Sequence, residues 1–312
     1  MKKKLLLIVT FAIVLIAISI SCSKSKIEIR LNLQKGQRFM MLYHTDMKMT
    51  QKFMGMPIEM DMKMDMDLEF ENTGQDNDSN YLMTVTYQAI KYQMKAQGQL
   101  ISFSTENSSA DTLMDKVFSN IKGKSFDMKI NKSGKIIEIS KLDSLSAYLF
   151  GNMSDSSRMK EFSELFNKNF GEESIRNNFG IFFGFYPENP VSVGDKWMNT
   201  TAVKSFFALT IENNYQLTSD KNDLYEINIQ SNMKTDAKDE QVEIKGMQMK
   251  FNMKGTQTGS IRIDQKTAWI SDSEIKQKIT GDAIISKPGL TGGGNFAIPY
   301  TMESTTKISL KK

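Results

Sequence analysis

The clearest hydrophobic pattern lies between Phe53 and Phe70, where apolar and charged residues alternate strictly from Met60 onward. The apolar positions are Met60, Met62, Met64, Met66, Leu68 and Phe70. The charged positions between them are Asp61, Lys63, Asp65, Asp67 and Glu69. Because successive side chains of a strand point to opposite faces, this pattern predicts a half-buried β-strand with a methionine-lined inner face.

A weaker stretch of the same kind lies far downstream. Its apolar positions, which alternate with polar ones, are Met247, Met249, Phe251 and Met253. Two landmarks bracket each stretch: residues 36–40 (GQRFM) resemble residues 194–198 (GDKWM), and residues 128–131 (MKIN) resemble residues 261–264 (IRID). We interpret the two methionine stretches as matching strands of a duplicated β-unit, with units at residues 27–140 and 187–312.

Strands are expected along most of the chain. In the first unit the pattern predicts them at residues 27–33, 39–53, 58–70, 81–94 and 100–104, followed by a hairpin over 125–139 that turns at 131–134. In the second unit the β-region begins at Lys196-Trp197, with strands near 206–217, 224–232, 242–263, 268–280 and 299–310. The expected fold is mainly β: two related antiparallel units forming a large twisted sheet or open barrel.

Helical spacing of apolar residues is confined to two places. Residues 111–121 form a short amphipathic segment, and residues 141–186 form a helical insertion between the units. Within the insertion, Phe162, Phe166 and Phe170 share one apolar face. Because isolated helices of this length are marginal in water, we expect this face to dock on the methionine-lined sheet.

The N-terminus reads as a targeting segment. Three lysines at positions 2–4 precede the apolar run Leu5–Ile20, which is short for a membrane span and suitable for a signal peptide. The run ends at Cys22, the only cysteine of the chain. This arrangement resembles the lipobox of bacterial lipoproteins, although Ser19 replaces the usual leucine. The resemblance implies a signal peptide at residues 1–21, a lipid-bearing Cys22 and a tether at residues 22–26.

The lipobox resemblance also implies a location. No acidic run follows Cys22, and Ser23 rather than aspartate comes next. By the sorting patterns of such lipoproteins, the expected location is the periplasmic face of the outer membrane. An ordinary secretory signal with an incidental cysteine is the alternative.

Charge and composition narrow the range of functions. Without the signal peptide, 37 Lys+Arg (40 minus Lys2, Lys3 and Lys4) face 36 Asp+Glu, so nothing indicates nucleic-acid binding. His44 is the only histidine, which excludes His/Cys metal clusters by count and leaves little for triad catalysis. The glycine-rich residues 291–295 lack the Gly-Lys-Ser/Thr of a phosphate loop. We expect neither an enzyme nor a cofactor.

A proline-flanked segment opens the second unit. Residues 187–197 read Pro-x-x-Pro-Val-x-x-Gly-Asp-x-Trp, from Pro187 to Trp197. This motif and the general layout resemble uncharacterised lipoproteins of Gram-negative bacteria, over most of the chain. The resemblance implies the architecture but no site, because no function is assigned to that family. The residues themselves indicate a structural role, with proline fixing the entry, glycine allowing a turn and tryptophan packing in the core.

The methionines leave three interpretations open. Methionine fills irregular interiors or lines adaptable binding surfaces, and its thioether is a soft ligand that suits Cu(I). We expect an outer-membrane-anchored envelope module without catalytic activity. Its methionines either pack a closed interior or hold an apolar ligand such as a lipid, and an envelope protein is the other partner left open. The alternative is a periplasmic Cu(I)-binding protein. The candidate lining is Met60, Met62, Met64, Met66, Met247, Met249, Phe251, Met253, Phe162, Phe166 and Phe170. The outline is similar to periplasmic carriers that hold acyl chains between a curved sheet and helices.

Overall fold

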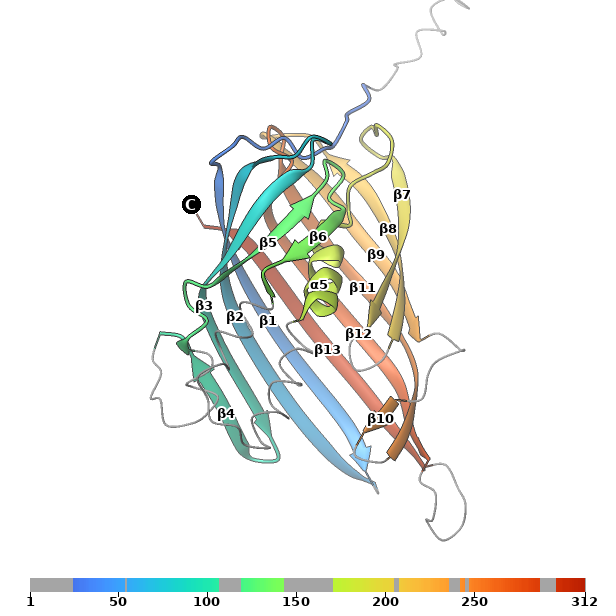
Figure 1. The fold of residues 1–312 in the computed structure, drawn as a ribbon. Helices are drawn as coiled ribbons and strands as arrows, with labels where there is room; N and C mark the ends of the chain where they lie inside the picture. Colours follow the sequence, from blue (N-terminus) through green and yellow to red (C-terminus); the bar gives the residue numbers. More distant parts are fainter. Residues whose placement is uncertain are drawn as a thin grey trace, which may run out of the picture.

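The structure is a computed structural model that describes residues 25–53, 55–106, 119–142, 171–204, 208–235, 242–244, 247–286 and 296–311. Its main feature is one large antiparallel sheet that does not close into a barrel (Figure 1). The described residues are about 70% strand and 5% helix, which confirms the mainly-β prediction.

The sheet contains 13 strands in the order β6-β5-β3-β2-β1-β13-β12-β11-β9-β8-β7, with β4 added to β3 and β10 to β11. The first half supplies β1 (Arg38–Phe53), β2 (Met56–Gln75), β3 (Tyr81–Ala96), β4 (Gln99–Ser104), β5 (Ser125–Ile130) and β6 (Ile136–Ser140). The second half supplies β7 (Lys196–Lys204), β8 (Ala208–Ser219), β9 (Leu224–Thr235), β10 (Val242–Ile244), β11 (Met247–Asp264), β12 (Ile270–Ser286) and β13 (Phe296–Leu310).

The two halves of the chain join in the middle of the sheet. The C-terminal strand β13 pairs with the first strand β1, with Tyr43 opposite Ile308 and Gln51 opposite Tyr300. On the other side of β1 lies β2, and this is the long hairpin that the alternation predicts. The strand ends beside residues 27–33 are called the upper end below, and the ends near the β1–β2 turn are called the lower end, as in Figure 1.

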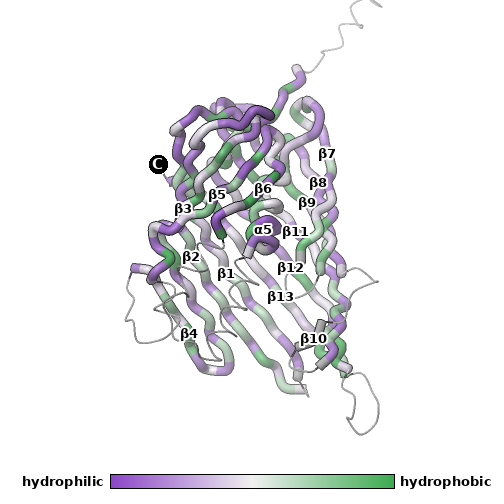
Figure 2. Tube along the Cα trace, viewed as in Figure 1, coloured by the Kyte–Doolittle hydropathy of each residue, from purple (hydrophilic) through white to green (hydrophobic). Residues whose placement is uncertain are grey.

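The alternation places charges on one face of the sheet and apolar side chains on the other. Along β8, β9 and the upper part of β3, every second residue is buried. The same alternation is visible as changing hydropathy along the long strands in Figure 2. The face that carries the buried side chains is the one on which helix α5 (Glu172–Phe183) packs, and it is called the inner face.

Residues 27–33 are not the strand that their alternation predicts. They run across the upper end of the sheet, with one bridge between Ile27 and Val191. The backbone N–H of Leu31 donates to Lys132 O at 2.9 Å, and that of Asn32 donates to Thr267 O at 3.0 Å. The alternation is correct because every second side chain is buried, but the backbone partners are turns of both halves rather than a neighbouring strand.

The second half also differs in detail from the prediction. The stretch expected at 242–263 is two strands, β10 and β11, which pair with each other. Strand β7 is separate from β8, and β12 continues past Gly281 to Ser286. Glycine is a common strand breaker, but here Gly281 has extended backbone and stays paired with Tyr300.

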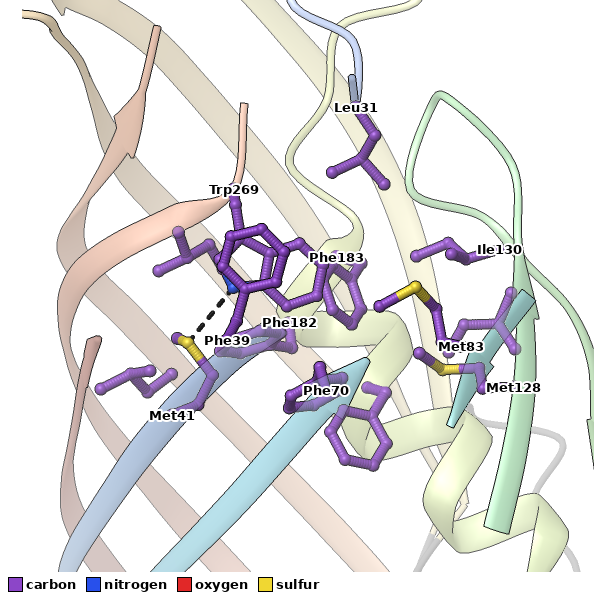
Figure 3. Packing of buried hydrophobic residues seen from close by; sticks show 14 of the residues in the cluster. Leu31, Phe39, Met41, Phe70, Met83, Met128, Ile130, Phe182, Phe183 and Trp269 are labelled. Atoms are coloured by element: carbon purple, nitrogen blue, oxygen red, sulfur yellow. Dashed lines mark hydrogen bonds between the residues drawn. The ribbon is translucent and has the colours of Figure 1, made fainter. Parts of the chain in front are cut away.

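The main core lies at the upper end, between α5 and the inner face. Phe70 makes edge-to-face contacts with Phe179 and Phe183, at centroid distances of 5.7 and 6.2 Å. Trp269 stacks on Phe39 at 4.4 Å and is fully buried (Figure 3). These contacts join α5 to both halves of the sheet, because Phe70 comes from β2 and Trp269 precedes β12.

The proline-flanked motif has the structural role expected of it. Gly194 has a positive φ of 98° and donates its N–H to Leu217 O at 2.7 Å. Trp197 donates its indole Nε1–H to Phe185 O at 2.8 Å. The motif therefore ties the end of the α5 segment to the edge strand β7.

Candidate functional site

A cluster of methionines lies on the inner face below the aromatic core. The register places Met62 opposite Met47 on one side and Met94 on the other, and places Met49 between Met60 and Met302. Strands β3, β2, β1 and β13 supply them side by side. We call this surface the methionine face: Met47, Met49, Met60, Met62, Met64, Met94 and Met302. All seven side chains are partly exposed, unlike the sealed core above them.

Polar side chains border the methionine face and point to its sulfurs. The hydroxyl of Tyr92 donates to Met94 Sδ at 3.4 Å, and Gln51 Nε2 donates to Met49 Sδ at 3.4 Å. Thioether sulfur is a weak acceptor, so these contacts orient side chains without fixing them. The surface is therefore apolar, soft and adaptable.

A second apolar cluster lies beside the methionine face, lower on the inner face of β8 to β13. Its buried members are Ile211, Met233, Met253, Ile279, Ala283 and Ile298. Met302 packs against it and also belongs to the methionine face. The two surfaces are therefore continuous.

The structure places the predicted lining residues in different surroundings. Met60, Met62 and Met64 lie on the methionine face, whereas Met66 packs against the main core. The second cluster includes Met253, with Met249 and Phe251 packed against it.

The remaining predicted positions are not assigned to the site. Met247 begins β11, and Phe162, Phe166 and Phe170 lie outside the described residues. The two methionine stretches also occupy unequal positions, since Met60–Met66 belong to the second strand of the first half and Met247–Met253 to the fifth strand of the second.

A row of hydrogen-bonded polar side chains crosses the inner face, and the sequence analysis did not find it. The residues face one another across six neighbouring strands from β13 to β7. We call this row the polar belt: Ser304, Gln277, Gln257, Ser231, Asn213 and Asn199.

The bonds of the polar belt run in one unbroken series. Gln277 Nε2 donates to Gln257 Oε1 at 2.7 Å, and Ser231 Oγ donates to Asn213 Oδ1 at 2.7 Å. The series ends where Asn199 Nδ2 donates to Gly184 O, at the C-terminus of α5. A polar residue at an inward-facing strand position, such as Gln257, is a sequence signal for one member of the belt, but the row as a whole follows only from the register.

The polar belt meets the methionine face at one point. Ser304 on β13 is opposite Met47 on β1, so the row of polar side chains continues across β1, β2 and β3 as thioethers. The belt also separates the main core from the second cluster. At this level of the sheet, the inner face is therefore polar on β13 to β7 and apolar on β1, β2 and β3.

Two buried hydroxyl groups on the inner face lack a hydrogen-bond partner among the described residues: Tyr43 Oη and Ser273 Oγ. Both lie opposite Ile308, which separates them. Burial raises the pKa of Tyr43 well above its usual value. An unsatisfied buried hydroxyl lowers the stability of the fold, so these two hydroxyl groups are an unusual feature of the interior.

The sheet is open between its two edge strands, β6 and β7, where a cleft of about 750 Å³ lies over α5. Its walls include Ile136, Arg176 and Trp197. Arg176 donates to Ile136 O at 3.1 Å and to Glu172 at 2.7 Å, so its guanidinium is already committed to the protein.

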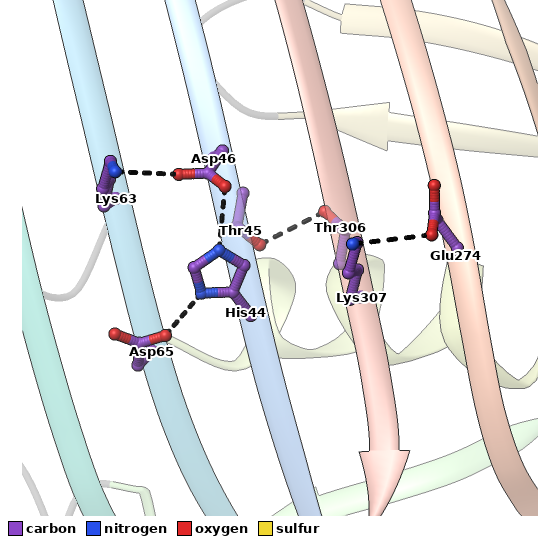
Figure 4. Close-up of polar contacts among 8 residues, drawn as sticks. All are labelled: His44, Thr45, Asp46, Lys63, Asp65, Glu274, Thr306 and Lys307. Atoms are coloured by element: carbon purple, nitrogen blue, oxygen red, sulfur yellow. Dashed lines mark hydrogen bonds and ion pairs between the residues drawn. The ribbon is translucent and has the colours of Figure 1, made fainter.

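His44 lies on the outer face, away from the methionines. Its Nδ1 is 2.6 Å from Asp65 Oδ1, and its Nε2 is 2.8 Å from Asp46 Oδ2 (Figure 4). These hydrogen bonds raise the pKa of His44 above its usual value. The sheet separates His44 from the methionine face, so His44 could not be a ligand of a metal held there. Among the described residues, no group of three His, Cys, Asp or Glu could hold a metal ion.

Comparison with known proteins gives a family and a fold. Residues 78–270 match a family of unknown function, DUF6263. No curated protein is significantly similar. Within the part of the chain that is described, no helix is long and apolar enough to cross a membrane.

Among solved structures, one described as lipid–protein interactions in lipovitellin matches with a TM-score of 0.50 and 10% identity. The match covers 90% of this chain but only 26% of that chain. It shows a similar fold.

Two further matches have TM-scores too low to indicate a shared fold. OccK11 (OpdR) from Pseudomonas aeruginosa has a TM-score of 0.19 and 6% identity, over 90% of this chain and 99% of that one. A DUF1329 family protein from Desulfovibrio piger has a TM-score of 0.14 and 8% identity, over 88% and 85%.

Proposed function

We propose a function for this chain, which belongs to DUF6263, a family of unknown function: it is a non-catalytic lipoprotein of the cell envelope that binds an amphipathic lipid on its inner face. The observation that carries the proposal is the methionine face, where seven partly exposed thioethers from four adjacent strands form one surface. Methionine is the residue that adapts best to ligands of variable shape.

The polar belt supplies the second half of the proposed site. An acyl chain would lie along the methionine face, and its polar group would reach Ser304, where the belt begins. Ligand sites of this kind are mostly apolar, with a few convergent polar groups that set the orientation. The fold-level likeness to lipovitellin is consistent with this use of the sheet, although fold does not establish function.

The anchor is a separate part of the proposal. Cys22 lies outside the described residues, and we propose that it carries the lipid that holds the protein at the periplasmic face of the outer membrane. Cys22→Ala should then remove lipid labelling and release the protein from the membrane fraction. Unchanged labelling and fractionation would contradict the anchor but leave the inner-face site untouched.

The ligand site is tested by native mass spectrometry of the purified full chain, followed by displacement with a fluorescent fatty acid. We expect co-purified lipid and saturable binding of the fatty acid. Met62→Gln should weaken that binding, because it places an amide in the middle of the apolar surface. Met198→Gln is the matched control, since Met198 is 72% exposed on β7 and outside the site. No bound lipid and no saturable binding in the wild-type chain would refute the proposal.

Clustering of thioethers also favours a second function, which is Cu(I) binding. Met62→Leu separates the two functions, because leucine preserves volume and apolarity but removes the sulfur. If the site holds Cu(I), this variant should lose most of its Cu(I) affinity in a competition titration. If the site holds lipid, fatty-acid binding by the variant should remain close to wild type.

A further inference from the structure

As far as these strands are described, the inner face has no charged side chain at any inward-facing position of β3, β2, β1, β13, β12, β11, β9, β8 or β7. The outer face of the same strands carries ion pairs, such as Lys278–Glu303 at 2.7 Å. On α5, the acidic side chains of the first turn are exposed, and Arg176 is bonded to Ile136 O and to Glu172. A ligand on the described inner face therefore meets apolar and neutral polar groups.

Four hydroxyl groups lie on this face, directly above the point where the polar belt meets the methionine face. Thr306 is one inward-facing position beyond the belt residue of β13, and its Oγ1 is 3.2 Å from that of Thr45 on β1 (Figure 4). One row higher, Tyr43 and Ser273 lie on either side of Ile308. We call these four residues the hydroxyl cluster: Tyr43, Thr45, Ser273 and Thr306.

The hydroxyl cluster has more hydrogen-bonding capacity than the described residues satisfy. Tyr43 Oη and Ser273 Oγ are buried and have no partner among those residues. In the pair of Thr45 and Thr306, only one hydroxyl can donate to the other, so the second proton is left for a further acceptor. Burial is the cause of the raised pKa of Tyr43, and a cation beside the phenol would lower that pKa. The cluster thus offers donors without a positive charge.

We infer that the amphipathic lipid of the inner face is a neutral one, whose uncharged polar group, a hydroxyl or an ester, lies against the hydroxyl cluster. A carboxylate or phosphate placed there would be buried without a cation, which weakens binding strongly. A neutral oxygen can accept the same hydrogen bonds without that desolvation of a charge. The acyl chain would then follow the methionine face, where Met64 is opposite Thr45. This inference rests on the proposed function, because it specifies the class of ligand for the same surface.

Decanol and decanoate test the inference, because they share a chain length and differ in charge. Each competes with the fluorescent fatty acid for the purified full chain, below the concentration at which either lipid aggregates. At neutral pH, decanol should displace the probe at a concentration roughly tenfold lower than decanoate, because the carboxylate is desolvated without a partner. As the pH falls and decanoate becomes protonated, the difference should narrow.

The possible failures of this competition are distinguishable. Displacement by decanoate that equals or exceeds displacement by decanol at neutral pH would overturn the inference and leave the proposed function standing. If the probe does not bind and decanol does not bind, the proposed function fails, and the inference fails with it.

Variants of the hydroxyl cluster show whether the polar group is hydrogen-bonded there. Tyr43→Phe and Thr306→Val should each weaken decanol binding roughly 3- to 10-fold, which is the loss expected for one hydrogen bond. Thr305→Val is the matched control, because Thr305 is the neighbouring residue on the outer face, opposite Asp46, and it should leave decanol binding unchanged. Tyr43→Phe removes an unsatisfied hydroxyl, so a loss of binding in that variant is not a consequence of unfolding. Unchanged decanol binding in both cluster variants, or an equal loss in Thr305→Val, would overturn the inference.

Discussion

Trp269 donates its indole Nε1–H to the sulfur of Met41, at 3.2 Å, although 228 residues separate the two in the chain. Both side chains are fully buried, and Trp269 also stacks on Phe39. We expect Trp269→Ala to lower the free energy of unfolding by about 3–5 kcal/mol, because it leaves a cavity where the two halves of the chain meet. Chemical unfolding followed by circular dichroism measures the change.

The partner residue is the control for this prediction. Met41→Leu removes the sulfur but conserves volume, so it should cost less than about 1.5 kcal/mol. A loss for Met41→Leu as large as that for Trp269→Ala would show that the indole–sulfur contact, rather than the packing of the ring, dominates the junction.

Met62 and Asp61 test the two faces of β2. Met62 points to the methionine face, and Asp61 is exposed on the outer face. Met62→Asp should destabilise by about 1–3 kcal/mol, because it brings an unpaired charge onto an apolar surface that is only partly exposed. Asp61→Asn should change the melting temperature little. Equal, small effects at both positions would contradict the assignment of the faces.

Gly134 and Gly98 have nearly the same backbone conformation in very different surroundings. Their φ angles are 76° and 80°. A Cβ on Gly134 would overlap Phe183 O and the ring of Tyr186, whereas a Cβ on Gly98 would meet nothing. Gly98→Ala should cost about 1–2 kcal/mol from backbone strain alone. Gly134→Ala should cost about 1–3 kcal/mol more, because it also overpacks the contact with α5. Unfolding midpoints that agree for the two variants would refute the tight contact.

The stability of the folded protein should depend on pH through His44, in a direction that the pKa of this residue predicts. Its pKa is raised, first by the hydrogen bond to Asp65 and then by that to Asp46, although Lys307 lies opposite on β13. Because the folded-state pKa of His44 is raised, its contribution to stability is complete below the unfolded-state pKa, near 6.5. That contribution is lost as pH rises through the folded-state pKa. Because the ring is half exposed, the effect should be small. Melting temperatures of wild type and His44→Gln should differ most at acidic pH and converge as pH rises through the folded-state pKa of His44.

The period-two pattern predicts the fold well, because each strand buries one face. The β1–β2 hairpin and the turn at Asn131–Gly134 appear where the alternation and the turn residues place them. Residues 27–33 show the limit of the pattern. Alternating burial is correct there, but the hydrogen-bond partners are turns, and a pattern of side chains contains no information about backbone partners.

The candidate site could be predicted only in part. The methionines of β2 are readable from sequence, but Met94 and Met302 join them only through strand pairing between distant segments. Polar residues that face inward, such as Gln257, look like errors in an apolar strand until the neighbouring strands are known. Such a row is recognisable only from the register.

The last prediction concerns Tyr43, whose buried hydroxyl has no partner among the described residues. Tyr43→Phe keeps the ring contact with Phe182, at 5.4 Å, and removes the unsatisfied group. A buried hydroxyl without a hydrogen bond costs about 1–3 kcal/mol, so the variant should be more stable than wild type by an amount of that order. Tyr186→Phe is the matched control, because its buried hydroxyl donates to Ala268 O at 2.7 Å, and its loss should destabilise. Opposite shifts in the unfolding midpoint are therefore expected, and a loss of stability in both variants would show that Tyr43 has a partner. If the lipid's polar group provides that partner, Tyr43→Phe should also weaken fatty-acid binding, whereas Tyr186→Phe should not.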